Sequence, residues 1–108
     1  MKTNEPAAVV RLDGELDVSR KGELRSALQG ALQARSVLLD LAGVTYADST
    51  ALVELLHFCN DLKAAHVPVA LVIVAPQFAR LISYAGLDQA FAVFVERDAA
   101  LAYLAAQA

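Results

Sequence analysis

The stretch SVLLDLAGVTYADSTALVELL, residues 36–56, joins a strand to a helix and decides the fold of this chain. Its first six residues are almost continuously apolar, which is typical of a strand with helices packed on both faces. A turn containing Gly43 follows, and three helix N-cap residue types then stand together as Asp48, Ser49 and Thr50. The helix expected over residues 50–65 has apolar residues at helical spacing, namely Leu52, Leu55, Leu56, Cys59 and Leu62.

Three further segments have the character of strands. Residues 8–16 alternate between apolar and polar side chains, so this strand has one solvent-exposed face and is expected at or near a sheet edge. Residues 69–74 (VALVIV) are continuously apolar, like residues 36–41, and both strands are therefore expected in the centre of the sheet. Residues 91–95 (FAVFV) predict a short last strand.

Helices are expected between and after these strands. The first covers residues 19–34, with Asp17 and Ser19 as N-cap candidates; the third is stopped by Gly86, and Asp98 caps the last. Strands that alternate with helices predict a parallel sheet with right-handed crossovers. The sequence therefore predicts an α/β fold with a mixed, mostly parallel β-sheet of four to five strands and four α-helices.

The length and composition favour one soluble, cytoplasmic domain. A chain of 108 residues has no room for two independent cores, so residues 1–108 are expected to form a single domain with a short polar N-terminal segment over residues 1–7. The net charge is −3 and basic residues do not cluster, so nucleic acid is not an expected partner. The longest apolar run, residues 67–76, is far shorter than the ~20 residues of a membrane helix, so the protein is not expected to be membrane-embedded.

The sequence lacks the usual signatures of enzyme chemistry. The nucleophile elbow G-x-S-x-G, the dinucleotide motif G-x-G-x-x-G and the phosphate-binding P-loop are absent. His57 and Cys59 are two positions apart on a helix, so they do not share a face and no metal site is expected. Asp40 falls in an apolar strand, where it either needs a partner or marks the strand end. We therefore expect a protein that is not an enzyme, with no catalytic residue, metal or cofactor.

The triplet Asp48, Ser49 and Thr50 has two interpretations. The simpler one is that one of these residues caps the helix, as most such triplets do. The functional one is that a phosphate is tolerated here, beside backbone N–H groups and the positive end of the helix dipole. A phosphate on Ser49 would add roughly −2 of charge to a surface that Asp48 and Asp17 already make negative.

Residues 40–55 (DLAGVTYADSTALVEL) resemble the signature of the STAS family, typified by bacterial anti-sigma factor antagonists. In that family a strand ends in an acidic-Leu turn, an aromatic residue follows, and Asp-Ser-Ser/Thr-Gly-Leu opens a helix. Tyr46 and residues 48–50 fill the aromatic and Asp-Ser-Thr places. The family's Gly-x-Leu-Asp landmark is present as residues 14–17, and its Gly-Leu helix end lies within residues 83–87. The resemblance covers essentially the whole chain and implies a STAS-like single domain.

The resemblance also implies a regulator of transcription that works by partner switching. In such proteins an anti-sigma factor that is itself a serine kinase phosphorylates the residue that matches Ser49. The unphosphorylated antagonist binds the anti-sigma factor and frees the sigma factor, the phosphorylated form is released, and a phosphatase resets it. The implied partner-binding residues are Asp17, Asp48, Ser49, Thr50 and Ala51.

Two departures from the family pattern bear on this role. Ala51 replaces the usual glycine, and its methyl group is expected to narrow the approach of a partner backbone. The strand that often precedes the Gly-x-Leu-Asp strand is nearly missing. An alternative from the same fold is a STAS subunit of a phospholipid-transport ABC transporter, which binds the ATPase. Such subunits commonly lose the acceptor serine or carry threonine there, so Ser49 favours the regulator.

Overall fold

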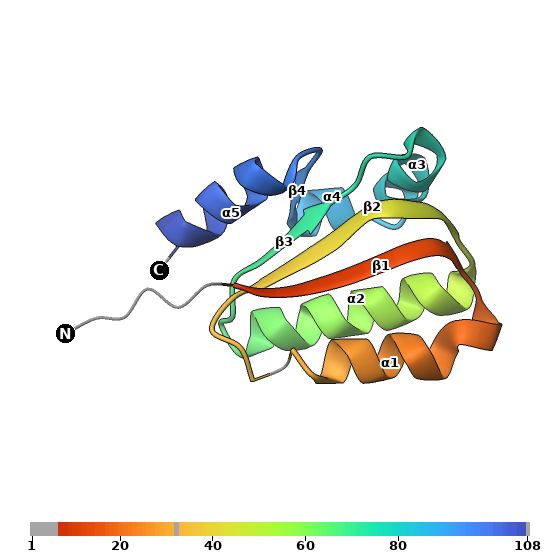
Figure 1. The fold of residues 1–108 in the computed structure, drawn as a ribbon, viewed down its shortest axis with the longest axis horizontal. Coiled ribbons are helices and arrows are strands. Elements are labelled where there is room, and N and C mark those ends of the chain that lie inside the picture. The colour runs from red at the N-terminus through yellow and green to blue at the C-terminus, as the bar shows by residue number, and fades with distance from the viewer. Residues whose placement is uncertain (1–6, 32, 108) are drawn as a thin grey trace.

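Four strands form one sheet, in the order β1-β2-β3-β4 and with all neighbouring pairs parallel (Figure 1). The computed structural model describes residues 7–31 and 33–107. The strands are β1 (Ala8–Leu16), β2 (Val37–Ala47), β3 (Val69–Val72) and β4 (Ala92–Phe94). The predicted positions are confirmed, because β1 lies at an edge and β2 and β3 lie in the centre.

The helices divide between the two faces of the sheet (Figure 1). They are α1 (Lys21–Gln29), α2 (Ser49–Ala64), α3 (Pro76–Tyr84), α4 (Leu87–Ala90) and α5 (Arg97–Ala106), and a short 3-10 turn, η1 (Val18–Arg20), precedes α1. Side chains of α1 to α4 share one core cluster with the sheet, whereas α5 packs on the opposite face. Within the described ranges, α5 is the helix that packs on this second face.

The sheet and the helices differ from the expectation in two details. All pairings within the described ranges are parallel, so the sheet is not mixed. Each connection between consecutive strands contains a helix, which returns the chain to the same end of the sheet. The described residues form five α-helices and not four, because Gly86 adopts φ 77° after α3 and the short α4 begins directly after it. The predicted α/β class is confirmed.

The continuous apolar run of β2 is explained by burial on both faces. Val37, Leu39 and Leu41 point to the layer of α1 to α4, and Leu38 points to the layer of α5. Leu55, at the middle of α2, is fully buried in the first core, as its place in the helical stripe predicts. β2 therefore contributes side chains to the cores on both faces of the sheet, and α2 packs against the first of them.

Asp40 interrupts this apolar run and is buried, with 6% of its surface exposed. Its carboxylate accepts hydrogen bonds from Nε of Arg97 (3.1 Å) and from Nη2 of the same side chain, and also from the backbone N–H of Ala42 (3.1 Å). Burial opposes ionisation of the carboxyl group, but the bonds from Arg97 and Ala42 outweigh it and hold the pKa of Asp40 below its usual value. The expected need for a partner is therefore met from α5.

Two predicted helix starts are wrong. The first helix begins at Lys21 and not at residue 19, because Asp17 binds the N–H and the hydroxyl of Ser19 and so starts the turn η1 instead. The last helix has Glu96 at its N-cap position, which places Asp98 inside the first turn. The predicted polar segment over residues 1–7 lies, except for Ala7, outside the described residues.

Candidate functional site

The predicted site residues gather where β1 and β2 end. Leu16 pairs with Ala47 in the sheet, and the backbone N–H of Asp48 donates to the carbonyl of Leu16 (2.9 Å). Asp17 and Asp48 directly follow these paired residues, so both lie where the carboxyl ends of β1 and β2 meet. Ligands and partners of open α/β sheets bind at this carboxyl edge.

The end of β1 is held in a fixed shape by Arg20. Gly14 has φ 78°, a left-handed conformation that a residue with a Cβ adopts only with strain. Nη1 of Arg20 donates to the carbonyls of Asp13 (2.7 Å) and Glu15 (3.0 Å), on either side of that glycine. Nε and Nη2 of the same guanidinium bind the carboxylate of Glu23 at 3.1 and 2.9 Å. Arg20 thus ties the strand end to α1, a role that the sequence pattern does not reveal.

Asp17 remains a carboxylate in this arrangement. The hydrogen bond from the Ser19 hydroxyl is the largest influence on Asp17 and lowers its pKa. Asp17 therefore adds negative charge to the site.

Asp48 is the residue of the triplet that caps α2. Its side chain accepts a hydrogen bond from the backbone N–H of Ala51 (2.9 Å), and its φ and ψ of −81° and 176° are extended, as an N-cap requires. Ser49 is the first residue of the helix and is exposed, whereas Thr50 is half-buried. Of the two hydroxyl residues, Ser49 is thus the more accessible.

The side chain of Ala51 does not belong to the exposed surface. Ala51 is 2% exposed and belongs to the core beneath the helix, and its N–H is already bound by Asp48. The expectation that its methyl group narrows the approach of a partner needs correction, because that methyl group is directed inward. Of the other predicted site residues, Ser49 is exposed, and Asp17, Asp48 and Thr50 are half-buried.

Two exposed apolar side chains flank the exposed serine. Tyr46, two residues before the N-cap, is 47% exposed, and Val53, one helical turn after Ser49, is 46% exposed. Residues four apart on a helix lie on the same side of it, so Ser49 and Val53 present one surface. Exposed apolar groups beside polar ones are the usual composition of a protein interface. Sequence periodicity alone did not single out Val53.

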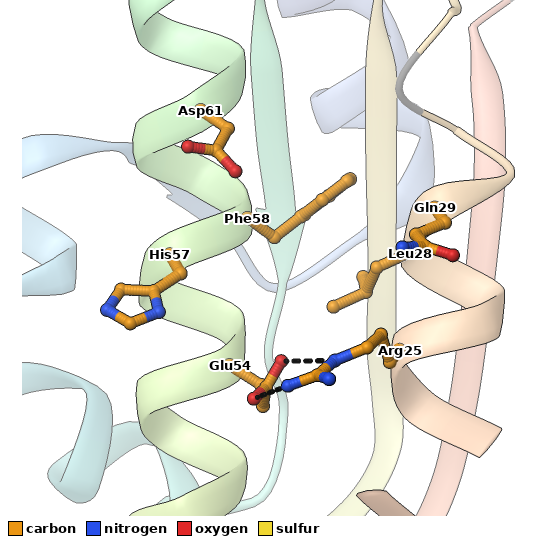
Figure 2. A pocket seen from close by; sticks show the side chains of 7 residues that line it. All are labelled: Arg25, Leu28, Gln29, Glu54, His57, Phe58 and Asp61. Carbon is orange, nitrogen blue, oxygen red and sulfur yellow. Dashed lines mark hydrogen bonds and ion pairs between the residues drawn. The ribbon is translucent and has the colours of Figure 1, made fainter. Parts of the chain in front are cut away.

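The other candidate groups do not form a chemical centre. Cys59 is buried, and burial raises the pKa of its thiol to about 12, so the sulfur stays protonated. His57 is exposed on α2 and lines a pocket between α1 and α2 (Figure 2). Within residues 7–31 and 33–107, no three His, Cys, Asp or Glu side chains are placed to hold a metal ion. Over the same ranges, no helix has the length and apolar character needed to cross a bilayer.

The fold and the site thus define a small parallel α/β domain with an exposed serine at the start of the helix that follows its second strand. Residues 1–100 match the model of the STAS domain family, and the chain belongs to that family. The resemblance inferred from residues 40–55 is therefore confirmed.

Solved structures with similar folds come from regulators and from a transporter family. An anti-sigma factor antagonist from Mycobacterium paratuberculosis is 24% identical, with a TM-score of 0.85 over 95% of this chain and 89% of that one. A sulfate transporter family protein from Wolinella succinogenes is 19% identical, with a TM-score of 0.76 over 94% of this chain and 86% of that one. The phosphorylated form of the Bacillus cell fate determinant SpoIIAA is 20% identical, with a TM-score of 0.67 over 91% of this chain and 92% of that one.

Proposed function

We propose that this protein is an anti-sigma factor antagonist, and that phosphorylation of Ser49 by a serine-kinase anti-sigma factor controls its binding to that partner. The observation that carries the proposal is the placement of Ser49: it is exposed, it opens α2, and Asp48 caps the helix from the preceding position. The protein acts by binding and is not itself an enzyme. Structural similarity to the Mycobacterium paratuberculosis antagonist and to SpoIIAA, an anti-sigma factor antagonist that is also solved in its phosphorylated form, supports this choice.

The local electrostatics suit a switch of this kind. The backbone N–H groups of the first helical turn have no partners within the helix, and they favour an added anion at the residue that opens it. The phosphate would therefore leave α2 folded. The phosphate would also place roughly two negative charges beside Asp48 and close to Asp17. A partner whose surface is complementary to the unphosphorylated site would then meet this added charge.

Release of the partner follows from this change in charge. A partner that packs on Ser49 and Val53 must remove water from both side chains, and a phosphate at that point is costly to desolvate. Binding of the unphosphorylated form and release of the phosphorylated form need no change in the fold.

The test is recovery of the partner with matched variants. We expect wild-type protein and Ser49→Ala to retain a serine kinase of the anti-sigma type from extracts of the native cells, and Ser49→Asp to lose it. Ser83→Asp is the matched control, because Ser83 is exposed on α3, outside the site. Equal retention by Ser49→Asp and the wild type would contradict the proposal. Recovery of an ABC ATPase in place of a kinase would support the transporter alternative.

A further inference from the structure

A pocket of about 240 Å³ opens between α1 and α2, away from the sheet (Figure 2). Leu28 and Phe58 form its apolar floor, and both are almost fully buried. Polar side chains form the rim, namely Arg25, Gln29, Glu54, His57 and Asp61. Sites for drug-sized ligands have volumes of about 300–1,000 Å³, so this pocket is suited to a single long side chain or a small molecule.

The charges of the rim select a cation. Arg25 and Glu54 form an ion pair that joins the two helices, with Nη2 to Oε2 at 2.8 Å and Nε to Oε1 at 3.4 Å. This pair closes one end of the pocket in Figure 2. Asp61 is exposed and its carboxylate forms no hydrogen bond or ion pair within the described part of the chain. The rim thus has two acidic groups, Glu54 and Asp61, together with the imidazole of His57 and one arginine that is already paired.

The pocket lies further along α2 than Ser49 and part of the way round the helix from it. Ser49, Val53, His57 and Asp61 are exposed and follow one another at intervals of four residues, and each interval advances about 40° around the helix axis, so Asp61 lies roughly 120° round the helix from Ser49. The rise of an α-helix, 1.5 Å per residue, puts Asp61 about 18 Å from Ser49 along the axis. An interface of standard size buries about 800 Å² on each partner, which is enough to cover both places at once.

We propose that this pocket receives an arginine or lysine side chain of the same protein partner that docks on Ser49; this inference rests on the proposed function. The aliphatic part of the side chain lies on Phe58 and Leu28, and its charged end binds the carboxylate of Asp61. A bidentate guanidinium fits a carboxylate better than an ammonium does, so arginine is the preferred occupant.

The pocket can be tested without the partner. We expect N-acetyl-arginine amide, titrated into ¹⁵N-labelled protein, to shift the amide signals of Leu28, Phe58 and Asp61 with millimolar saturation. N-acetyl-citrulline amide, the neutral isostere, should bind at least fivefold more weakly. Asp61→Asn should weaken arginine binding roughly tenfold. The matched control Asp98→Asn, on α5 and the other face of the sheet, should not.

The inference is overturned if the arginine probe does not bind, if citrulline binds equally well, or if Asp61→Asn has no effect. The partner recovered through Ser49 gives the second measurement, since its affinity should fall roughly tenfold for Asp61→Asn and stay unchanged for Asp98→Asn. A partner that responds to Ser49→Asp but not to Asp61→Asn overturns this inference and leaves the proposed function intact. A kinase that does not bind at all overturns the proposed function, and the titration still decides whether the pocket takes a cation.

Discussion

The guanidinium of Arg97, the first residue of α5, binds the carboxylate of Asp40 within β2. The two residues are 57 positions apart in the chain, and the carboxylate is buried whereas 43% of the Arg97 side chain is exposed. The core under α5 is small and includes two alanines, Ala70 and Ala100. This ion pair is therefore a substantial part of what holds α5 on the sheet.

Removing the arginine should destabilise the protein. Arg97→Ala leaves the buried Asp40 carboxylate without its charged partner, and we expect a loss of about 1–3 kcal/mol in the free energy of unfolding. Urea denaturation followed by circular dichroism measures this loss. Arg80→Ala is the matched control, since Arg80 is exposed on α3 and its guanidinium forms no hydrogen bond or ion pair within the described ranges. Equal stability of the two variants would show that the pair does not hold α5.

The same pair should make stability depend on pH in the acidic range. The pKa of Asp40 is lower in the folded protein than the unfolded value of about 3.9. Its stabilising contribution is therefore complete above that value and is lost as the pH falls through the folded pKa. We expect the difference in urea midpoint between wild type and Asp40→Asn to be constant near neutral pH and to shrink below about pH 4. A difference that grows on acidification would contradict the lowered pKa.

Truncation of Leu55 tests the packing of α2. Leu55→Ala removes a fully buried side chain and should cost about 2–5 kcal/mol through lost burial and the remaining cavity. Val53→Ala, on the exposed side of the same helix, should cost much less. Thermal melts of both variants give the comparison, and a fall in Tm of less than about two degrees for Leu55→Ala would show that the helix packs differently.

Phosphorylation should fall on Ser49 and not on Thr50. Ser49 is exposed, whereas Thr50 is half-buried and follows it into the helix. We expect mass spectrometry, after incubation with the recovered kinase and ATP, to find the phosphate on Ser49. The unfolding free energy of the phosphoprotein should stay within about 1 kcal/mol of the unmodified protein, because the helix N-terminus accommodates the anion. Phosphate found only on Thr50 would overturn the assignment.

Restoring the family glycine should reduce stability without improving phosphorylation. Ala51→Gly removes a methyl group from the core and lowers helix propensity, so we expect a loss of about 1–2 kcal/mol. The rate of phosphorylation by the recovered kinase should be unchanged within about twofold, since the lost methyl group faces inward. A large gain in rate would mean that the methyl group of Ala51 obstructs the kinase after all.

Local sequence patterns were enough to predict the fold, but they predicted the site only in part. Apolar periodicity placed each strand and separated the central strands from the edge strand, because burial on one or both faces leaves a direct mark on the sequence. The N-cap of the second helix could likewise be narrowed to Asp48, Ser49 or Thr50 from residue type alone. The role of Arg97 depends on contact between distant segments, and the role of Arg20 depends on the left-handed backbone of Gly14. Neither residue lies in an apolar pattern, so periodicity gives no signal for it.

The inward direction of Ala51 shows the same limit at the site. The family pattern marked the position, but the side of the helix that it faces depends on where α2 begins. Once Asp48 is the N-cap, residue 51 falls on the same side as Leu55, four residues later, and both are buried. A shift in the helix register would have changed that result.

The guanidinium of Arg20 also protects the protein against unwanted strand addition. β1 is a nine-residue strand at the edge of the sheet, and long unpaired edges act as templates on which other chains aggregate. The carbonyl of Leu16 faces β2, since it accepts from the N–H of Asp48, so the carbonyl of the preceding Glu15 faces outward. Arg20 occupies that outward carbonyl together with the carbonyl of Asp13. A strand from another molecule therefore meets two occupied carbonyls and a guanidinium at the end of β1.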